Sequence, residues 1–328
     1  MRVISASEVE AVLETEALVE QLRQMFRAGA TAPTRHHHTV PVPGGPDATL
    51  LLMPAWQVGR YMGVKIVTVF PGNAEKSLPS VMGSYALLSA RTGEPLALID
   101  GRMLTLRRTA CASALAAKYL ARADAARLLM VGTGALAPHL ILAHARVRPI
   151  REVLIWGRNP DKAARLAKTL DGRRLTVRAT DDLAGAVHGA DVISCATLSK
   201  EPLVRGEWLQ PGQHVDLVGG FTPEMREADD VAIERARVFV DTYEGALKEA
   251  GDIVQPLARG VITREMIAGD LAELTQGRVA GRRFHNQITL FKSVGTAIED
   301  LAAAILLFET TLDRAPGEGH GHGGVLRG

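Results

Sequence analysis

The residues with the clearest chemical potential form a glycine turn, Gly132-x-Gly134-x-x-Ala137, which follows the apolar run 128–131. Glycine at the first position permits a tight turn out of a strand, and glycine at the second lets the backbone approach a pyrophosphate. Alanine at the third allows the next helix to pack closely, with its first N–H groups aimed at the anion. A second strand at 153–156 completes this context, so we interpret the turn as a dinucleotide-binding site rather than a glycine turn without a ligand.

The end of that second strand bears on the choice of dinucleotide. An acidic residue there usually binds the ribose 2′-OH of NAD, but here the strand is followed by Gly157, Arg158 and Asn159. The guanidinium of Arg158 suits a 2′-phosphate, which it can hold with two hydrogen bonds. The alternative is that Arg158 stacks over the adenine of NAD. On charge, we expect NADP(H) to be preferred, with NAD(H) possible.

Two further sets of charged residues lie before the turn. Lys65 stands alone in the apolar strand 61–69. It lies either on the solvent face or in the interior, where burial would lower its pKa and equip it for proton transfer or for polarising a C=N bond. Spacing alone favours the solvent face. Arg107 and Arg108 stand where we place the start of a small-residue helix, against the helix dipole, which indicates an anionic ligand; a structural salt bridge explains them equally well.

The elements that must position these residues fall into two groups. Short strands joined by Gly/Pro turns fill the first part and indicate a mixed or antiparallel sheet, followed by a helix over 104–120. From residue 126, strands alternate with helices, which indicates a parallel, doubly wound α/β sheet. A last apolar helix, over 293–311, can close either part. The Gly/His-rich tail 316–328 is expected to be disordered.

Composition bounds the class of protein. A chain of 328 residues with 47% hydrophobic and 23% charged residues is long enough for two ordinary domains. A net charge of +2 gives no case for nucleic-acid binding, and no apolar run approaches the roughly eighteen residues of a membrane span. Cys111 and Cys195 lie among small residues and outside any metal-ligand spacing, so we expect buried thiols, no metal site and a cytoplasmic location.

Taken together, several motifs resemble the ornithine cyclodeaminase/mu-crystallin family over about residues 2–312. Besides the glycine turn they are the segments 63–73, 106–112, 155–158, 218–227 and 288–295. The resemblance implies a Rossmann domain, residues 120–293, and a substrate-binding and dimerisation domain, residues 1–119 with 294–315. It also implies a homodimer.

Carried over by position, Lys65 resembles the family's active-site lysine, Arg108 its carboxylate-binding arginine and Arg35 a second arginine. The chain departs from the cyclodeaminases at Phe221, where those enzymes carry a catalytic aspartate. The surrounding segment instead resembles bacterial reductases of cyclic imino acids. The implied catalytic residues are Lys65 and Arg108, and the implied substrate contacts are Arg35, Lys65, Arg108, Phe221 and Thr222. The implied cofactor contacts are Thr109, Gly132, Thr133, Gly134, Ala135, Leu136, Ala137, Arg158, Asn159, Ala196, Thr197, Val218, Gly219, Ser293, Val294 and Gly295.

We therefore predict NAD(P)H-dependent reduction of a cyclic 2-imino acid, 1-pyrroline-2-carboxylate or 1-piperideine-2-carboxylate, to L-proline or L-pipecolate. One alternative is ornithine cyclodeaminase, a lyase that uses NAD catalytically. The other is a non-enzymatic protein that binds NADP or a small ligand. Retention of Lys65 and Arg108 argues against the latter. No nucleic acid or membrane partner is expected.

Overall fold

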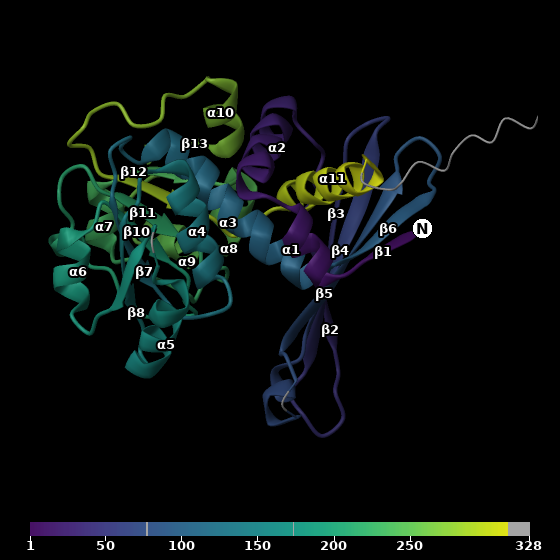
Figure 1. Cartoon of the computed structure of the whole chain (residues 1–328), viewed down its shortest axis with the longest axis horizontal. Helices are drawn as coiled ribbons and strands as arrows, with labels where there is room; N and C mark the ends of the chain where they lie inside the picture. Colours follow the sequence, from purple (N-terminus) through teal and green to yellow (C-terminus); the bar gives the residue numbers. More distant parts are fainter. Residues whose placement is uncertain (77, 173, 314–328) are drawn as a thin grey trace, which may run out of the picture.

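The computed structural model describes residues 1–76, 78–172 and 174–313. It contains two β-sheets with helices packed on each (Figure 1). The α/β class and the combination of a parallel sheet with a mixed sheet confirm the prediction. The tail 316–328, predicted to be disordered, lies outside the described residues.

The first sheet has six strands in the order β1-β6-β5-β4-β3-β2. Its β1–β6 pair is parallel and the other pairs are antiparallel, so the sheet is mixed. The 3-10 helix η1 (Pro71–Lys76) follows β4 at the end of an arm that projects from the body (Figure 1). The strands are β1 (Arg2–Ile4), β2 (His36–Val40), β3 (Ala48–Trp56), β4 (Tyr61–Val69), β5 (Val81–Ser89) and β6 (Pro95–Asp100).

Helices cover one face of this sheet: α1 (Ala6–Val12), α3 (Gly101–Leu120) and α11 (Ala297–Asp313) pack against its strands, and α2 (Thr15–Ala28) packs on α3 and α11. Helix α3 begins earlier than predicted, because the Asp100 side chain accepts the Met103 amide at 2.7 Å and caps it there. Arg108 is therefore two turns inside the helix, and the argument from its dipole was wrong. Helix α11 begins at Ala297 rather than Ser293, and it packs against β3, β4 and β5.

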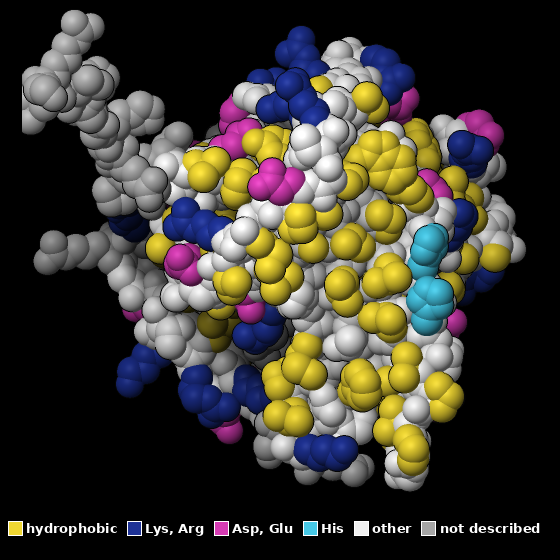
Figure 2. Space-filling view, turned by 90° about the vertical axis from the view of Figure 1, so that its right-hand side faces the viewer, with side chains coloured by type: hydrophobic (Ala, Val, Ile, Leu, Met, Phe, Trp, Pro, Cys, Tyr) yellow, Lys and Arg dark blue, Asp and Glu magenta, His cyan; other side chains and the backbone are white. Residues whose placement is uncertain are grey.

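The other face of the mixed sheet is largely apolar. Along β4 the buried residues Gly63 and Lys65 alternate with Met62, Val64 and Ile66, which point the other way. Ile66 is 38% exposed. Figure 2, a view of this side of the molecule, shows hydrophobic side chains gathered across it.

The second sheet has eight parallel strands in the order β13-β12-β14-β11-β10-β7-β8-β9. They are β7 (Arg127–Val131), β8 (Glu152–Trp156), β9 (Thr176–Ala179), β10 (Val192–Cys195), β11 (His214–Leu217), β12 (Arg237–Val240), β13 (Ile267–Asp270) and β14 (Thr289–Lys292). The connecting helices are α4 (Ala137–Val147), α5 (Pro160–Leu170), α6 (Leu183–Gly189), α7 (Asp230–Arg235), α8 (Tyr243–Glu249), α9 (Gly251–Ala258) and α10 (Leu271–Gln276), with 3-10 helices η2 (Gly206–Trp208) and η3 (Arg264–Met266).

Alternate side chains of β7 enter two separate cores, as a doubly wound sheet requires. Leu128 and Met130 join a core that includes residues of α3, α4 and α11, whereas Leu129 and Val131 join a core with residues of α6 to α9. Strand β7 has β10 on one side and β8 on the other, so the strand order reverses here. In such sheets ligands bind beyond the carboxyl ends of the strands at this point.

Cys111 and Cys195 are buried free thiols, as predicted, and burial raises the pKa of Cys111 to about 12. Within the described ranges, no helix is long and apolar enough to cross a membrane. Those same residues contain no group of three or more His, Cys, Asp or Glu side chains placed to hold a metal ion.

Candidate active site

The glycine turn lies directly after β7. Gly132 has a φ of +124°, and a Cβ there would lie 2.6 Å from the Ala196 carbonyl oxygen, so only glycine fits. A Cβ on Gly134 would meet nothing within 4 Å, because this backbone borders open space. Ala137 is fully buried at the start of α4. The turn therefore offers exposed backbone in front of a helix N-terminus, which suits a pyrophosphate.

A cavity of about 370 Å³ opens beside this turn, at the carboxyl ends of β7, β10, β11 and β14. Both the glycine turn, through Gly134, and Arg108 contribute to its wall. It is lined by Thr105, Arg108, Thr109, Gly134, Ala135, Leu136, Ala196, Thr197, Leu198, Val218, Gly219, Phe221, Ser293, Val294 and Gly295. Most of the cofactor contacts inferred from the sequence thus meet around one cavity, together with Phe221.

Other inferred contacts do not line this cavity. Arg158 is exposed just beyond β8, and the Asn159 side chain accepts the Lys162 amide at 3.0 Å, capping α5. A Cβ on Gly157 would lie 2.7 Å from the Thr133 methyl group, so Thr133 packs against β8's end. Thr222, inferred as a substrate contact, is half-buried and is not part of the cavity wall.

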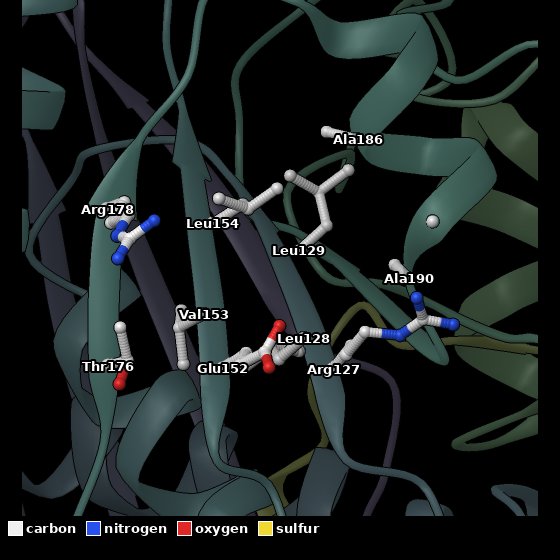
Figure 3. Close-up of a pocket in the computed structure, with 11 residues that line it drawn as sticks. Arg127, Leu128, Leu129, Glu152, Val153, Leu154, Thr176, Arg178, Ala186 and Ala190 are labelled. Carbon is white, nitrogen blue, oxygen red and sulfur yellow. The ribbon is translucent and has the colours of Figure 1, made fainter.

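A second hollow on the same sheet is distinct from this site. It measures about 440 Å³ and lies over the amino-terminal ends of β7, β8 and β9, beside α6 (Figure 3). Arg127, Glu152 and Arg178 line it. Because nucleotides bind at the carboxyl ends of parallel strands, this hollow is not the predicted dinucleotide site.

A cluster of buried charges adjoins the cavity. Lys65 is 3% exposed, and its Nζ lies 2.8 Å from Asp300 Oδ2. The other oxygen of Asp300 accepts a hydrogen bond from Arg108 Nε at 3.0 Å, and a nitrogen at the end of the same guanidinium pairs with Glu299. The solvent-face position that spacing favoured for Lys65 was wrong, because β4 turns this side chain inward against α3 and α11.

Burial and mutual charge alter the protonation of the cluster. Burial, helped by the neighbouring charge of Arg108, lowers the pKa of Lys65 to about 8. Burial raises the pKa of Glu299 to about 7. Although burial acts in the opposite direction, Arg108 and Lys65 hold the pKa of Asp300 below its usual value. Lys65 and Glu299 therefore both titrate close to neutral pH, which is typical of groups at functional sites.

Arg35, in the loop between α2 and β2, reaches the same region. Its Nη2 donates to the Gly295 carbonyl at 2.6 Å, and its Nε lies 3.2 Å from Glu249. A small hollow of about 150 Å³ is lined by Arg35, Met53 and Gly295, among others. Gly295 therefore borders both this small hollow, which Arg35 lines, and the cavity beside the glycine turn, which Arg108 lines.

Gly295 has the conformation that this meeting point needs. Its φ is +80°, and a Cβ would lie 2.5 Å from an Arg108 guanidinium nitrogen. Asp241, which follows β12, holds the segment in place, because its Oδ2 accepts the amides of Val294 and Gly295 at 2.8 and 2.7 Å. Any side chain at 295 would push Arg108 away from the cavity.

Sequence reasoning did not single out Asp241, Glu299 or Asp300. The signal available for the last two was a pair of adjacent acids in the first turn of a largely apolar helix, Ala297–Asp313. Acids in the first helical turn also have a common explanation in the helix dipole, so the pattern does not distinguish a functional pair. For Asp241, the only signal in the sequence was an acidic residue directly after a strand.

A profile of the ornithine cyclodeaminase/mu-crystallin family matches residues 1–315. The chain belongs to this family. It is 45% identical over 322 residues to Protein SAR DEFICIENT 4 of Arabidopsis thaliana, covering 95% of this chain and 98% of that one. It is 38% identical over 317 residues to a Delta(1)-pyrroline-2-carboxylate reductase of Colwellia psychrerythraea, covering 95% and 100%.

A solved structure is similar over nearly the whole chain. It is the Delta(1)-pyrroline-2-carboxylate reductase of Thermococcus litoralis in complex with NADH and L-proline. The TM-score is 0.89 at 33% identity, and the match covers 96% of this chain and 98% of that one. Both the mixed sheet and the parallel sheet therefore follow the arrangement of that solved structure.

Proposed function

We propose that this protein is an NAD(P)H-dependent reductase of cyclic 2-imino acids, with 1-pyrroline-2-carboxylate as the first substrate to test. One observation carries the proposal: Arg108 lines the cavity beside the glycine turn, and it shares the carboxylate of Asp300 with buried Lys65. A dinucleotide and an anionic substrate can therefore meet there. The Colwellia and Thermococcus relatives, both named as pyrroline-2-carboxylate reductases, support the same reaction.

In this proposal, Arg108 binds the substrate carboxylate. Its Nε is held by Asp300 and one terminal nitrogen by Glu299, so the guanidinium presents its remaining N–H groups in a fixed orientation. Arg35 adds a second positive charge across Gly295. Clamping the carboxylate fixes the C=N carbon in front of the cofactor cavity, and such orientation is a large part of the rate enhancement.

Lys65 is the proposed group for hydrogen bonding and proton transfer at the substrate. A lysine with a pKa of about 8 is mostly protonated at neutral pH yet can release its proton. When bound, the reduced nicotinamide supplies the hydride to the imine carbon. The nitrogen receives one proton, so NAD(P)H and a proton are consumed and the cyclic amino acid is formed.

We also propose that NADPH is preferred to NADH. Arg158 is exposed beyond β8, and no acidic side chain follows the strand at 157–159. A guanidinium there suits a 2′-phosphate, whereas NAD sites usually carry an acid. NADH, which the Thermococcus relative binds, remains a usable cofactor in this proposal.

The assembly that we propose is a homodimer through the apolar face of the mixed sheet in the domain of residues 1–119 and 294–315. On that face Ile66 lies opposite Leu52, and Val64 opposite Pro54. A second copy would bury this surface, which is larger and more continuous than scattered surface hydrophobics. An archaeal alanine dehydrogenase of similar fold, 30% identical, is described as a dimer. Ile66→Glu should convert the dimer to a monomer in light scattering, whereas Val58→Glu, at an exposed turn residue, should not.

The deciding experiment follows NADPH and NADH oxidation with 1-pyrroline-2-carboxylate and 1-piperideine-2-carboxylate and identifies the products. We expect L-proline or L-pipecolate to form in proportion to the cofactor oxidised. Ornithine is incubated in parallel and ammonia is measured. Conversion of ornithine to proline with ammonia and no net change in NADH would assign a cyclodeaminase instead. Binding of NADPH without turnover of either imino acid would assign a binding protein.

A further inference from the structure

A buried carboxylate, Glu227, lies between the loops that follow β10 and β11. Its Oε1 accepts hydrogen bonds from the Thr197 amide at 2.7 Å and the Thr197 hydroxyl at 2.8 Å. Its Oε2 accepts the amides of Gly219 at 2.7 Å and Gly220 at 3.4 Å. Glu227 is fully buried, whereas Thr197 and Gly219 line the cofactor cavity. The Glu227 side chain thus links two segments of the cavity wall, at Thr197 and Gly219, without lining the cavity itself.

The loops that follow β10 and β11 lie so close together that no side chain fits at Gly219. A Cβ on Gly219 would lie 2.0 Å from the Thr197 carbonyl oxygen and 2.4 Å from Glu227 Oε1. The two loops are therefore in direct backbone contact, and the carboxylate is hydrogen-bonded to both. Because hydrogen bonds to an ionised group are about twice as strong as neutral ones, the charge of Glu227 matters as well as its shape.

A second carboxylate and a lysine hold Glu227 itself. Asp252 Oδ1 accepts the amides of Glu227 at 2.8 Å and Ala228 at 3.0 Å. Asp252 Oδ2 lies 2.9 Å from Lys292 Nζ, and both side chains are fully buried. Lys292 ends β14 and directly precedes Ser293, which lines the cavity. The network thus connects three of the strand ends around the cavity.

The geometry points to Glu227 as a positioning residue for the nicotinamide end of the cofactor, held in register by Asp252 and Lys292. This inference rests on the proposed function for dinucleotide binding and for its kinetic part. Glu227 touches neither reacting group; it acts through the backbone of Thr197 and Gly219. Four donors converge on it, so a neutral side chain that itself carries N–H groups cannot replace it.

The test compares Glu227→Gln with Asp191→Asn. Asp191 is a matched control, because it is also buried and its Oδ2 accepts two backbone amides, those of Ala126 and Arg127, at the opposite end of β7. Dissociation constants for NADPH are measured by fluorescence titration without substrate. We expect Glu227→Gln to raise the constant about tenfold, as the loss of a charged hydrogen-bond acceptor predicts, and Asp191→Asn to leave it unchanged.

Kinetics separate a positioning role from a general loss of structure. At saturating NADPH, Glu227→Gln should lower kcat while leaving the KM for the imino acid unchanged, because Arg108 and Lys65 are untouched. If Glu227→Gln does not fold, Asp252→Asn takes its place: it keeps Oδ1 for the two amides and loses only the pairing with Lys292. We expect it to raise the dissociation constant roughly threefold, less than Glu227→Gln does, because all four hydrogen bonds to the Glu227 carboxylate remain.

Unchanged NADPH affinity in a folded Glu227→Gln protein, or in Asp252→Asn if that variant is used, would overturn the inference. An equal loss in Asp191→Asn would also overturn it, because the effect would then come from general destabilisation. Both outcomes leave the proposed function intact. A wild-type protein that binds no dinucleotide would refute the proposed function and this inference together.

Discussion

The glycine turn after β7 and the charge cluster around Lys65 build adjoining parts of one site in different ways. The turn presents backbone: Gly132 supplies the positive φ and Gly134 the open approach. The cluster presents side chains, from β4 for Lys65, α3 for Arg108 and α11 for Asp300. A backbone site is a property of a few consecutive residues. A side-chain cluster exists only when distant segments pack together.

The difference also governs how each part is stabilised. The turn has few charges to satisfy, and its shape follows from permitted dihedral angles. In the cluster, two cations and two carboxylates are almost completely removed from water, and each depends on the others. Breaking a buried charge pair by removing one partner typically costs about 3–5 kcal/mol. We therefore expect substitutions in the cluster to have the larger effects.

The largest effect is expected for Arg108→Ala. Loss of the guanidinium should raise KM for the imino acid and lower kcat, reducing kcat/KM at least roughly 10²-fold, because the imine carbon is no longer oriented. NADPH affinity should hardly change. Arg107→Ala is the matched control, since Arg107 donates to the Leu13 carbonyl outside the cluster. Unaltered kinetics in a folded Arg108→Ala protein would make Arg108 a structural ion-pair partner only.

On the dinucleotide side, Arg158→Ala should weaken NADPH binding about tenfold and NADH binding hardly at all. A guanidinium paired with a phosphate is worth about 1.5–3 kcal/mol, and exposure of Arg158 favours the lower value. Fluorescence titration with both cofactors measures the difference. Arg165→Ala, another exposed arginine on the following helix, serves as control. Equal losses for NADPH and NADH would contradict the preference.

Phe221→Asp tests the cavity wall that the glycine turn and Arg108 share with Phe221. Phe221 is 46% exposed and lines the cavity, and an unpaired carboxylate there should reduce turnover of the imino acid roughly tenfold. Phe284→Asp, at a more exposed phenylalanine that is not part of the cavity wall, should have no such effect. Activity of Phe221→Asp equal to wild type would remove Phe221 from the substrate wall.

The last prediction concerns stability rather than activity, through the buried His214 in the parallel sheet. Burial lowers the pKa of His214 to about 3, against about 6.5 in an unfolded chain. Below pH 6.5 the unfolded state binds a proton that the folded state does not, so stability should fall as pH drops from about 6.5 toward 3. The slope contributed is at most about 1.4 kcal/mol per pH unit. Urea unfolding of the wild type and of His214→Asn at several pH values measures how the free energy of unfolding changes with pH. The same pH dependence in both proteins would contradict a lowered pKa for His214.

Much of the fold could be predicted because its signals are local. The strand–helix alternation from residue 126 predicted the parallel sheet, and the short strands before it predicted the mixed sheet. Helix boundaries were predicted wrongly where a capping side chain sets them. The Asp100 side chain caps α3 and starts it before the apolar pattern of the helix begins. The inward position of Lys65 could not be read from β4, since both faces of that strand are apolar and the pattern has no solvent side.

The sequence by itself determined the glycine turn, because Gly132, Gly134 and Ala137 act through backbone geometry within six residues. It also determined the family, through motifs that lie along nearly the whole chain. Only the tertiary structure decided that Asp300 joins Lys65 to Arg108, although 192 residues separate Arg108 from Asp300. The physical reason is that a buried charge takes its partner from whichever segment packs against it, and packing is settled by the whole core rather than by local spacing.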